Sequence, residues 1–110
     1  MHTMKVQTKY YHLLKQGTKR VELRLYDEKR QQIKVGDEIQ FSDLSDAADT
    51  FMARVVALHR APDFRALCDI VKPELCGFHD AAELVQIMEQ FYPADKQKQY
   101  GVVGIEIEKE

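Results

Sequence analysis

A single glycine divides the first part of the chain into a helical pattern and an extended pattern. Before Gly17, apolar residues recur at helical spacing over residues 8–16, and Thr8 can cap that segment. After it, apolar and charged residues alternate over residues 19–26, as they do in a strand. Glycine reaches the left-handed conformation at the end of a helix without a penalty from a Cβ atom. The sequence therefore predicts a helix that ends at Gly17 and turns directly into a strand.

The alternation within residues 19–26 puts two kinds of side chain on opposite faces of the predicted strand. The apolar members share the face that we expect to be buried, namely Val21, Leu23 and Leu25. The charged members and one aromatic residue share the other face, namely Arg20, Glu22, Arg24 and Tyr26. Lys19 has the parity of the apolar face, so we expect it to join Glu22 and Arg24 only if it still lies in the turn.

The rest of the chain shows several strand patterns, two helical patterns and a last strand pattern. Apolar alternation or continuous apolar runs predict strands near Met4 and over residues 38–41, 51–58 and 101–107. Asp63 opens a predicted helix that extends to residue 71 before Pro73. A second predicted helix, over residues 80–91, begins with a D-x-x-E sequence that resembles a capping box. Polar stretches predict loops over residues 27–32, 42–50 and 96–100.

The order of these elements sets the expected fold class. Strands and helices do not alternate regularly, which disfavours a doubly wound parallel sheet. The chain has 110 residues and is 45% hydrophobic, enough for the core of one domain, which we expect to span residues 1–110. We therefore expect an α+β fold with a curved, mostly antiparallel sheet or barrel and helices packed outside it.

Composition excludes several classes of function. There are 16 basic and 18 acidic residues, a net charge of −2, unlike proteins that coat duplex nucleic acid. Cys68 and Cys76 lie in apolar surroundings and are expected to be buried free thiols. The four histidines lack metal-ligand spacing, so we expect neither a metal nor a cofactor. Without an apolar leader or a long apolar run, the protein is expected to be cytoplasmic, with no membrane partner.

The charged residues around the predicted turn could form a binding site. Lys19 and Arg24 would supply positive charge, and Glu22 could accept a hydrogen bond from an exocyclic amine. Lys19 could contact phosphate or, if burial lowered its pKa, act as a general base. Tyr26 could stack on a base. The structural alternative is an exposed strand face with a salt bridge worth about 0–1 kcal/mol.

The order Gly17-x-Lys19-x-x-Glu22-x-Arg24 resembles the G-x-K-x-x-E-x-R signature of the ASCH domain family. Residues 11–17 resemble the helix that precedes this signature in the family. Residues 33–41, with their Gly-Asp pair, resemble a family strand, and residues 100–105 resemble the final strand. These landmarks cover essentially the whole chain in the family's order.

The resemblance implies a PUA-like β-barrel with a cleft beside the signature, which binds RNA or a nucleotide. Some small family members deacetylate N4-acetylcytidine with the signature lysine and a threonine nucleophile three residues later, and others are described as ribonucleases. This chain keeps Lys19 but has Glu22 at the threonine position. No secure counterpart of the downstream carboxylate of those enzymes is found, although Glu74 lies in the corresponding region.

Two hypotheses follow. The first is a non-catalytic module that binds RNA, a nucleotide or a modified nucleoside through Lys19, Glu22, Arg24 and Tyr26. The second is a hydrolase acting on a modified nucleoside, or a ribonuclease, with Lys19 and Glu22 as proton-transfer groups. We favour the first. Under either hypothesis, Lys19→Ala and Arg24→Ala are expected to abolish binding while the melting temperature stays close to that of the wild type.

Overall fold

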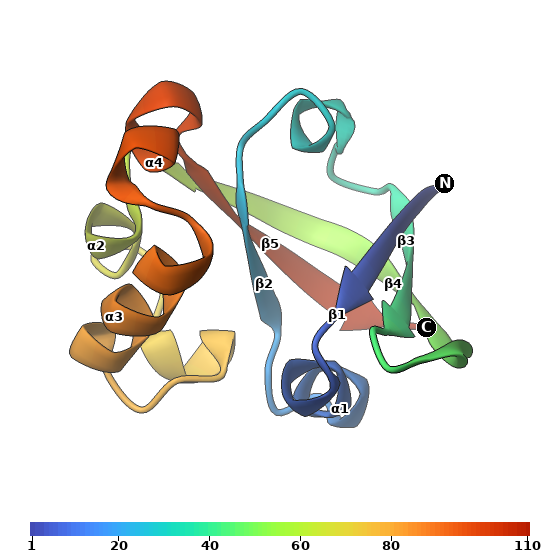
Figure 1. Ribbon diagram of the computed structural model, residues 1–110. Coiled ribbons are helices and arrows are strands. Elements are labelled where there is room, and N and C mark those ends of the chain that lie inside the picture. The colour runs from blue at the N-terminus through green and yellow to red at the C-terminus, as the bar shows by residue number, and fades with distance from the viewer.

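A curled sheet of five strands forms the centre of the structure (Figure 1). The computed structural model describes all of residues 1–110, and the strands are β1 His2–Val6, β2 Val21–Leu25, β3 Glu38–Asp43, β4 Asp46–Ala61 and β5 Val102–Lys109. Their order in the sheet is β1-β3-β4-β5-β2, and only the β1–β3 pair is parallel. The expected α+β fold with a mostly antiparallel, curved sheet is confirmed.

Four helices pack around the sheet (Figure 1). They are α1 Thr8–Gln16, α2 Phe64–Leu67, α3 Ala81–Phe91 and α4 Ala94–Tyr100, and short 3₁₀ turns occur at Arg30–Gln32 and Pro73–Cys76. The helix α1 lies at one end of the curl, whereas α2, α3 and α4 lie together beside β2 and β5. None of the helices combines the length and the apolar character needed to cross a membrane.

The sheet separates two hydrophobic cores. The inner core lies within the curl and contains Tyr11 and Phe41, both fully buried. The outer core lies between the sheet and the helices and contains Val21, Leu23 and Phe64. Both Val21 and Leu23 are buried, as the alternation predicts. The opposite face of β2 therefore points toward the inside of the curl.

Three local sequence signals are confirmed. Gly17 ends α1 in the left-handed conformation, with φ of 86°. Asp63 caps α2 by accepting a hydrogen bond from the Ala66 N–H. Asp80 caps α3 by accepting from the Glu83 N–H, and the Glu83 carboxylate accepts in return from a backbone N–H just before the helix. These local contacts set the ends of the helices without help from the core.

The prediction that Thr8 caps α1 is wrong. Gln7 precedes the first helical turn and makes no side-chain cap hydrogen bond. The Thr8 hydroxyl donates instead to Asp43 Oδ1 at the end of β3, at 2.6 Å. A tertiary contact with a carboxylate thus replaces the local cap.

The prediction of a loop over residues 42–50 is also wrong. The strands β3 and β4 continue through this segment as a polar ribbon with a turn at 44–45. Asp49 in the ribbon accepts hydrogen bonds from the Tyr11 hydroxyl and the Lys15 ammonium group, both at 2.8 Å. The polar sequence is extended because its side chains bond to α1, a contact that local turn propensity does not reveal.

The segment 96–100 is helical rather than a loop. It belongs to α4, which begins after Pro93. Gln97 is buried there, accepts from the Phe64 N–H at 3.1 Å and donates to the Tyr92 carbonyl at 2.8 Å. One buried amide therefore ties α4 to α2 and to the end of α3, which composition alone could not indicate.

The helix predicted over residues 63–71 is shorter than expected. The helix α2 ends at Leu67, and tighter turns follow in which the Ile70 N–H donates to the carbonyl of Leu67. Val71 is nevertheless buried. The apolar spacing holds, but it is satisfied by mixed turns rather than by one regular helix.

Gly104 offers a test of the outer core. A Cβ atom at this position on β5 would lie 2.9 Å from Val21 Cγ1 and 3.6 Å from Leu67 Cδ2. We expect Gly104→Ala to lower the free energy of unfolding by about 1–3 kcal/mol, because the core would be overpacked. Urea denaturation measures this change. Because Val21→Ala removes the overlap, the loss in free energy of unfolding of the double variant should be smaller than the sum of the losses of the two single variants. Additive losses would contradict this explanation.

Candidate functional site

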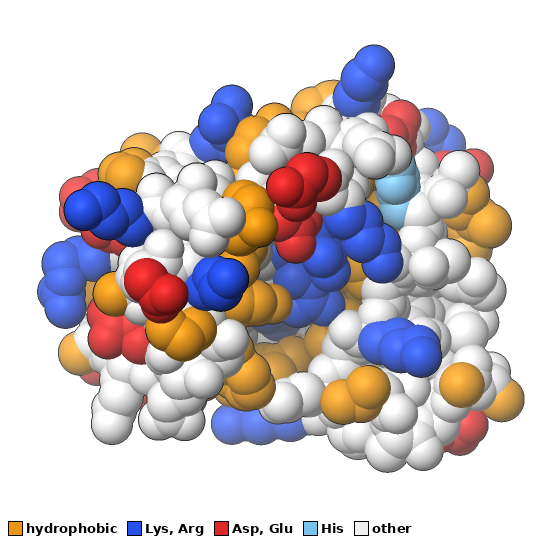
Figure 2. Space-filling view, turned by 45° about the horizontal axis from the view of Figure 1, so that its top comes forward, with side chains coloured by type: hydrophobic (Ala, Val, Ile, Leu, Met, Phe, Trp, Pro, Cys, Tyr) orange, Lys and Arg blue, Asp and Glu red, His pale blue; other side chains and the backbone are white.

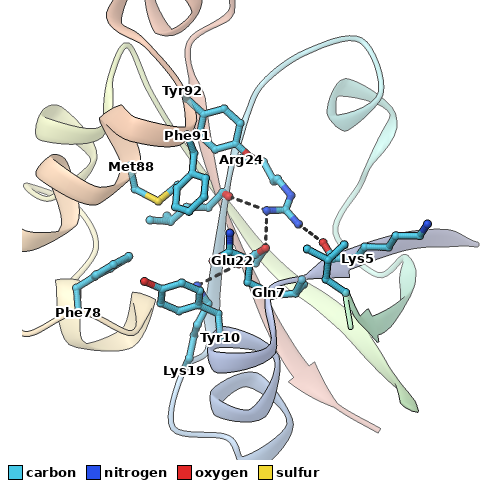
Figure 3. Close-up of a pocket in the computed structure, with 13 residues that line it drawn as sticks. Lys5, Gln7, Tyr10, Lys19, Glu22, Arg24, Phe78, Met88, Phe91 and Tyr92 are labelled. Atoms are coloured by element: carbon cyan, nitrogen blue, oxygen red, sulfur yellow. Dashed lines mark hydrogen bonds and ion pairs between the residues drawn. The ribbon is translucent and has the colours of Figure 1, made fainter. Parts of the chain in front are cut away.

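The open side of the curled sheet contains a cavity of about 150 Å³. It lies between the edge strands β1 and β2 and the helices α1 and α3 (Figure 3), and we call it the seam cavity. Its walls are mainly aromatic or long apolar side chains: Tyr10, Phe78, Met88, Phe91 and Tyr92. Figure 2 shows a hollow on this side of the molecule in which basic side chains lie beside hydrophobic ones.

Three charged residues lie together at the seam cavity: Lys19, Glu22 and Arg24, the charged trio. Glu22 Oε1 lies 3.0 Å from Lys19 Nζ, and Glu22 Oε2 lies 2.8 Å from Arg24 Nη1. The side chains of Lys19 and Glu22 are 3% and 4% exposed, and that of Arg24 is 15% exposed. This is a largely buried ion cluster rather than the exposed strand face of the structural alternative.

Lys19 joins the cluster because it lies in the turn, before β2 begins at Val21. Its backbone N–H donates to the Leu13 carbonyl, so the chain is still closing the end of α1 at this point. Its ammonium group donates to the Cys76 carbonyl at 3.0 Å and lies 5.0 Å from the centre of the Tyr10 ring. Lys19 therefore lies in the turn rather than in the strand, which is the condition under which it was expected to join Glu22 and Arg24.

Arg24 connects the two edges of the sheet. Its Nη2 donates to the Lys5 carbonyl of β1 at 2.9 Å, while Nη1 contacts Glu22 on its own strand (Figure 3). The β1 and β2 strands are the two ends of the sheet order and do not pair with each other. Arg24 Nε is buried and has no hydrogen-bond partner in the protein.

The charges determine the protonation of the cluster. Burial alone raises the pKa of the Glu22 carboxyl, but Arg24 and Lys19 outweigh it and hold that pKa below its ordinary value. Burial likewise acts to lower the pKa of Arg24, but Glu22 and Tyr92 outweigh it and raise that pKa. The carboxylate is therefore ionised at neutral pH and available only as a hydrogen-bond acceptor.

The lining of the seam cavity offers hydrogen-bonding groups and aromatic faces. None of its lining residues is a serine, threonine, cysteine or histidine. Cys76 is near Lys19 but does not line the cavity, and burial raises the pKa of its thiol to about 12. No group of three or more histidine, cysteine, aspartate or glutamate side chains comes together in the structure as a possible metal site.

Tyr26, the fourth residue proposed from the sequence, does not line the seam cavity. Its ring lies beneath the Arg60 guanidinium at the end of β2. Conversely, the sequence pattern did not identify the wall formed by Met88, Phe91 and Tyr92, because Met88 and Phe91 belong to a helically spaced apolar stripe, which is normally buried. Phe91 is 44% exposed and lies at the edge of that stripe. A large aromatic residue at the end of an apolar stripe is the signal that could have been used.

The burial of the charged trio changes one expectation. From the sequence, Lys19→Ala and Arg24→Ala were expected to keep the melting temperature of the wild type. That result would require both side chains to be partly exposed to water, whereas they are largely buried. Either variant leaves the buried Glu22 carboxylate with a single cationic partner. Removing one member of a buried ion pair typically costs about 3–5 kcal/mol. We therefore expect both variants to lose stability.

The lowered pKa of Glu22 predicts a pH dependence of stability. The ionised carboxylate stabilises the fold above its ordinary pKa of 4.5, and this contribution disappears as the pH falls through the lower value of the folded state. Glu22→Gln should reduce the free energy of unfolding at neutral pH and flatten its dependence on pH in acid. Urea titrations at a series of pH values measure both effects. If the free energies of unfolding of Glu22→Gln and the wild type changed in parallel with pH, the lowered pKa assigned to Glu22 would be contradicted.

Comparisons with known proteins agree with this architecture. The chain matches the family model of the ASCH domain over residues 4–110. The crystal structure of the hypothetical protein PH0355 is similar, with 36% identity, a TM-score of 0.86 and coverage of 98% of this chain and 97% of that chain. The solution NMR structure of protein PF0455 from Pyrococcus furiosus has 37% identity, a TM-score of 0.76 and coverage of 98% and 96%. No curated protein matches the chain.

The two kinds of similarity are consistent. The family match spans almost the whole chain, and both solved structures match this fold over nearly their full length. The curled sheet with its surrounding helices is consistent with a PUA-like fold. The chain therefore belongs to the ASCH domain family, a family generally linked to RNA binding.

Proposed function

We propose that the seam cavity binds an unpaired nucleobase, carried by a nucleoside, a nucleotide or single-stranded RNA. The observation that carries this proposal is a cavity with aromatic walls and a fixed carboxylate between two cations. Aromatic walls can stack on any base, and a carboxylate flanked by donors can bond to the polar edge of a base.

The volume favours a single ring system as the occupant. A cavity of 150 Å³ equals in size an engineered protein cavity that admits benzene. Sites for whole drug-sized ligands occupy about 300–1,000 Å³. A base would therefore enter while its sugar and phosphate stay outside, as occurs when proteins bind splayed-out bases of single-stranded RNA.

The charged trio retains hydrogen-bonding capacity for such a base. An ionised carboxylate offers about four acceptor sites, and Glu22 uses two of its contacts for Lys19 and Arg24. Lys19 has a third N–H beyond those given to Glu22 and the Cys76 carbonyl. The site thus combines an acceptor for an exocyclic amine with a donor for a carbonyl or ring nitrogen.

Hydrolysis of a modified nucleoside or of RNA is the alternative, because Lys19 and Glu22 touch at 3.0 Å and could transfer a proton. Two observations favour binding over it. The lowered pKa of Glu22 makes this carboxylate a weaker base than an ordinary glutamate. The lining also lacks a hydroxyl or thiol nucleophile other than tyrosine, so a hydrolase would have to activate water directly.

Phe91→Ala tests the proposed stacking wall. Because Phe91 is partly exposed, the variant should stay folded while the affinity falls about fivefold or more, as for loss of one stacked base. The probes are the four ribonucleosides and the four matching homotetraribonucleotides, titrated by calorimetry. Ile70→Ala is the matched control, since Ile70 is 56% exposed and lies outside the cavity. If the wild type binds none of these probes, the proposal is wrong.

Product analysis separates binding from hydrolysis. N4-acetylcytidine and short RNAs are incubated with the wild-type protein and examined by chromatography and mass spectrometry. We expect the ligands to be recovered unchanged. Product that forms with the wild type and disappears with Glu22→Gln, shown to be folded by circular dichroism, would favour the hydrolase instead.

A further inference from the structure

A second hollow begins at Tyr26, just beyond the end of β2 and two residues after Arg24 of the seam cavity. It has a volume of about 310 Å³, and we call it the rim hollow. Its side chains with planar groups are Tyr26, Arg60 and Tyr100, and it is completed by residues 61–62 and 101–102. The rim hollow is roughly twice as large as the seam cavity and reaches the lower end of the size range of small-molecule sites, about 300 Å³.

Arg60 presents an unpaired guanidinium group in the rim hollow. Its guanidinium carbon lies 3.9 Å from the centre of the Tyr26 ring, so the ring supports one side of the group. Arg60 forms no ion pair and no side-chain hydrogen bond within the protein, which is also true of Arg20 and Arg65, but Arg60 is the arginine that lies over an aromatic ring. The side chain is exposed, so its charge and its planar surface are open to a ligand.

One residue of each hollow, Arg24 of the seam cavity and Arg60 of the rim hollow, lies on the same face of the sheet. Arg24 on β2 pairs with Val103 on β5, and Val103 pairs with Arg60 on β4. Residues that pair directly across a sheet share a face, so Arg24 and Arg60 lie in one row with a single strand between them. Adjacent strands are about 4.8 Å apart, which places the backbones of this row about 10 Å apart. One short oligonucleotide can therefore reach both hollows.

We infer that the rim hollow binds the base of a nucleotide adjacent to the one whose base enters the seam cavity. This inference rests on the proposed function and identifies the ligand as single-stranded RNA of two or more nucleotides rather than a free nucleoside. The second base stacks on the open side of the Arg60 guanidinium, whose other side lies on Tyr26. Bases stack on arginine planes as they do on aromatic rings, and the guanidinium N–H groups can bond to phosphate as well.

The test compares nucleosides with oligonucleotides. Calorimetric titrations use the four ribonucleosides and the four matching homotetraribonucleotides, with wild-type protein, Arg60→Ala and Arg60→Lys. We expect the wild type to bind a tetranucleotide at least about fivefold more tightly than its nucleoside, in line with one additional stacked base. Both Arg60 variants should lose this advantage, while nucleoside affinity stays within about twofold of the wild-type value.

Two further variants complete the test. Arg60→Lys keeps the charge but lacks the plane, so full retention of tetranucleotide affinity in this variant would overturn the stacking inference. Tyr26→Leu removes the ring beneath the guanidinium and should weaken tetranucleotide binding selectively. Arg54→Ala removes an arginine near the middle of the same strand, outside both hollows, and should change neither affinity.

The outcomes distinguish this inference from the proposed function. Nucleoside binding with no gain for the tetranucleotide, or a gain that persists in Arg60→Ala, overturns the rim hollow as a second base site and leaves the seam cavity proposal intact. Absence of binding by every nucleoside and tetranucleotide overturns both.

Discussion

The ionised carboxylate of Glu22, held between Lys19 and Arg24 with almost no exposure to water, is the interaction on which the rest of this structure depends. A curled sheet that does not close leaves two unpaired edges, β1 and β2. Arg24 connects them, because one end of its guanidinium contacts Glu22 and the other contacts the Lys5 carbonyl. Lys19 connects the same carboxylate to the Cys76 carbonyl. One buried anion therefore orders the turn, the strand and the open side of the sheet together.

This arrangement supports the proposed binding function rather than a role for Glu22 in proton transfer. Two cations lower the pKa of Glu22, so the carboxylate is a poor base but a permanent acceptor in a fixed position. A preorganised acceptor binds without the cost of ordering a flexible side chain. Buried polar groups also give discrimination, because a ligand that lacks the matching N–H leaves them unpaired. The features that weaken the case for catalysis are thus the features that would make a binding site selective.

The sequence predicted the parts of the fold and site that depend on local chemistry. The helix end at Gly17, the buried face of β2 and the caps at Asp63 and Asp80 all follow from residue type and spacing, and all are observed. The errors occur where a distant partner decides. The polar ribbon is extended because of its bonds to α1, and α4 is helical around the buried Gln97. The aromatic wall of the seam cavity was not predicted. Helical periodicity identifies the apolar face of a helix, but it does not show which residues of that face other elements bury and which line a cavity.

The bonds between α1 and the β3–β4 ribbon have a mechanical consequence. They join the helix that carries Tyr10 to the turn that carries Leu44, and both residues line one side of the seam cavity. The end of α3, braced through Gln97, carries the facing side. Each side of the cavity is thus held in place by its own set of hydrogen bonds. Asp49 and Gln97 make these bonds without lining the cavity, so substitution of either residue is expected to loosen one side of the cavity and leave the other held.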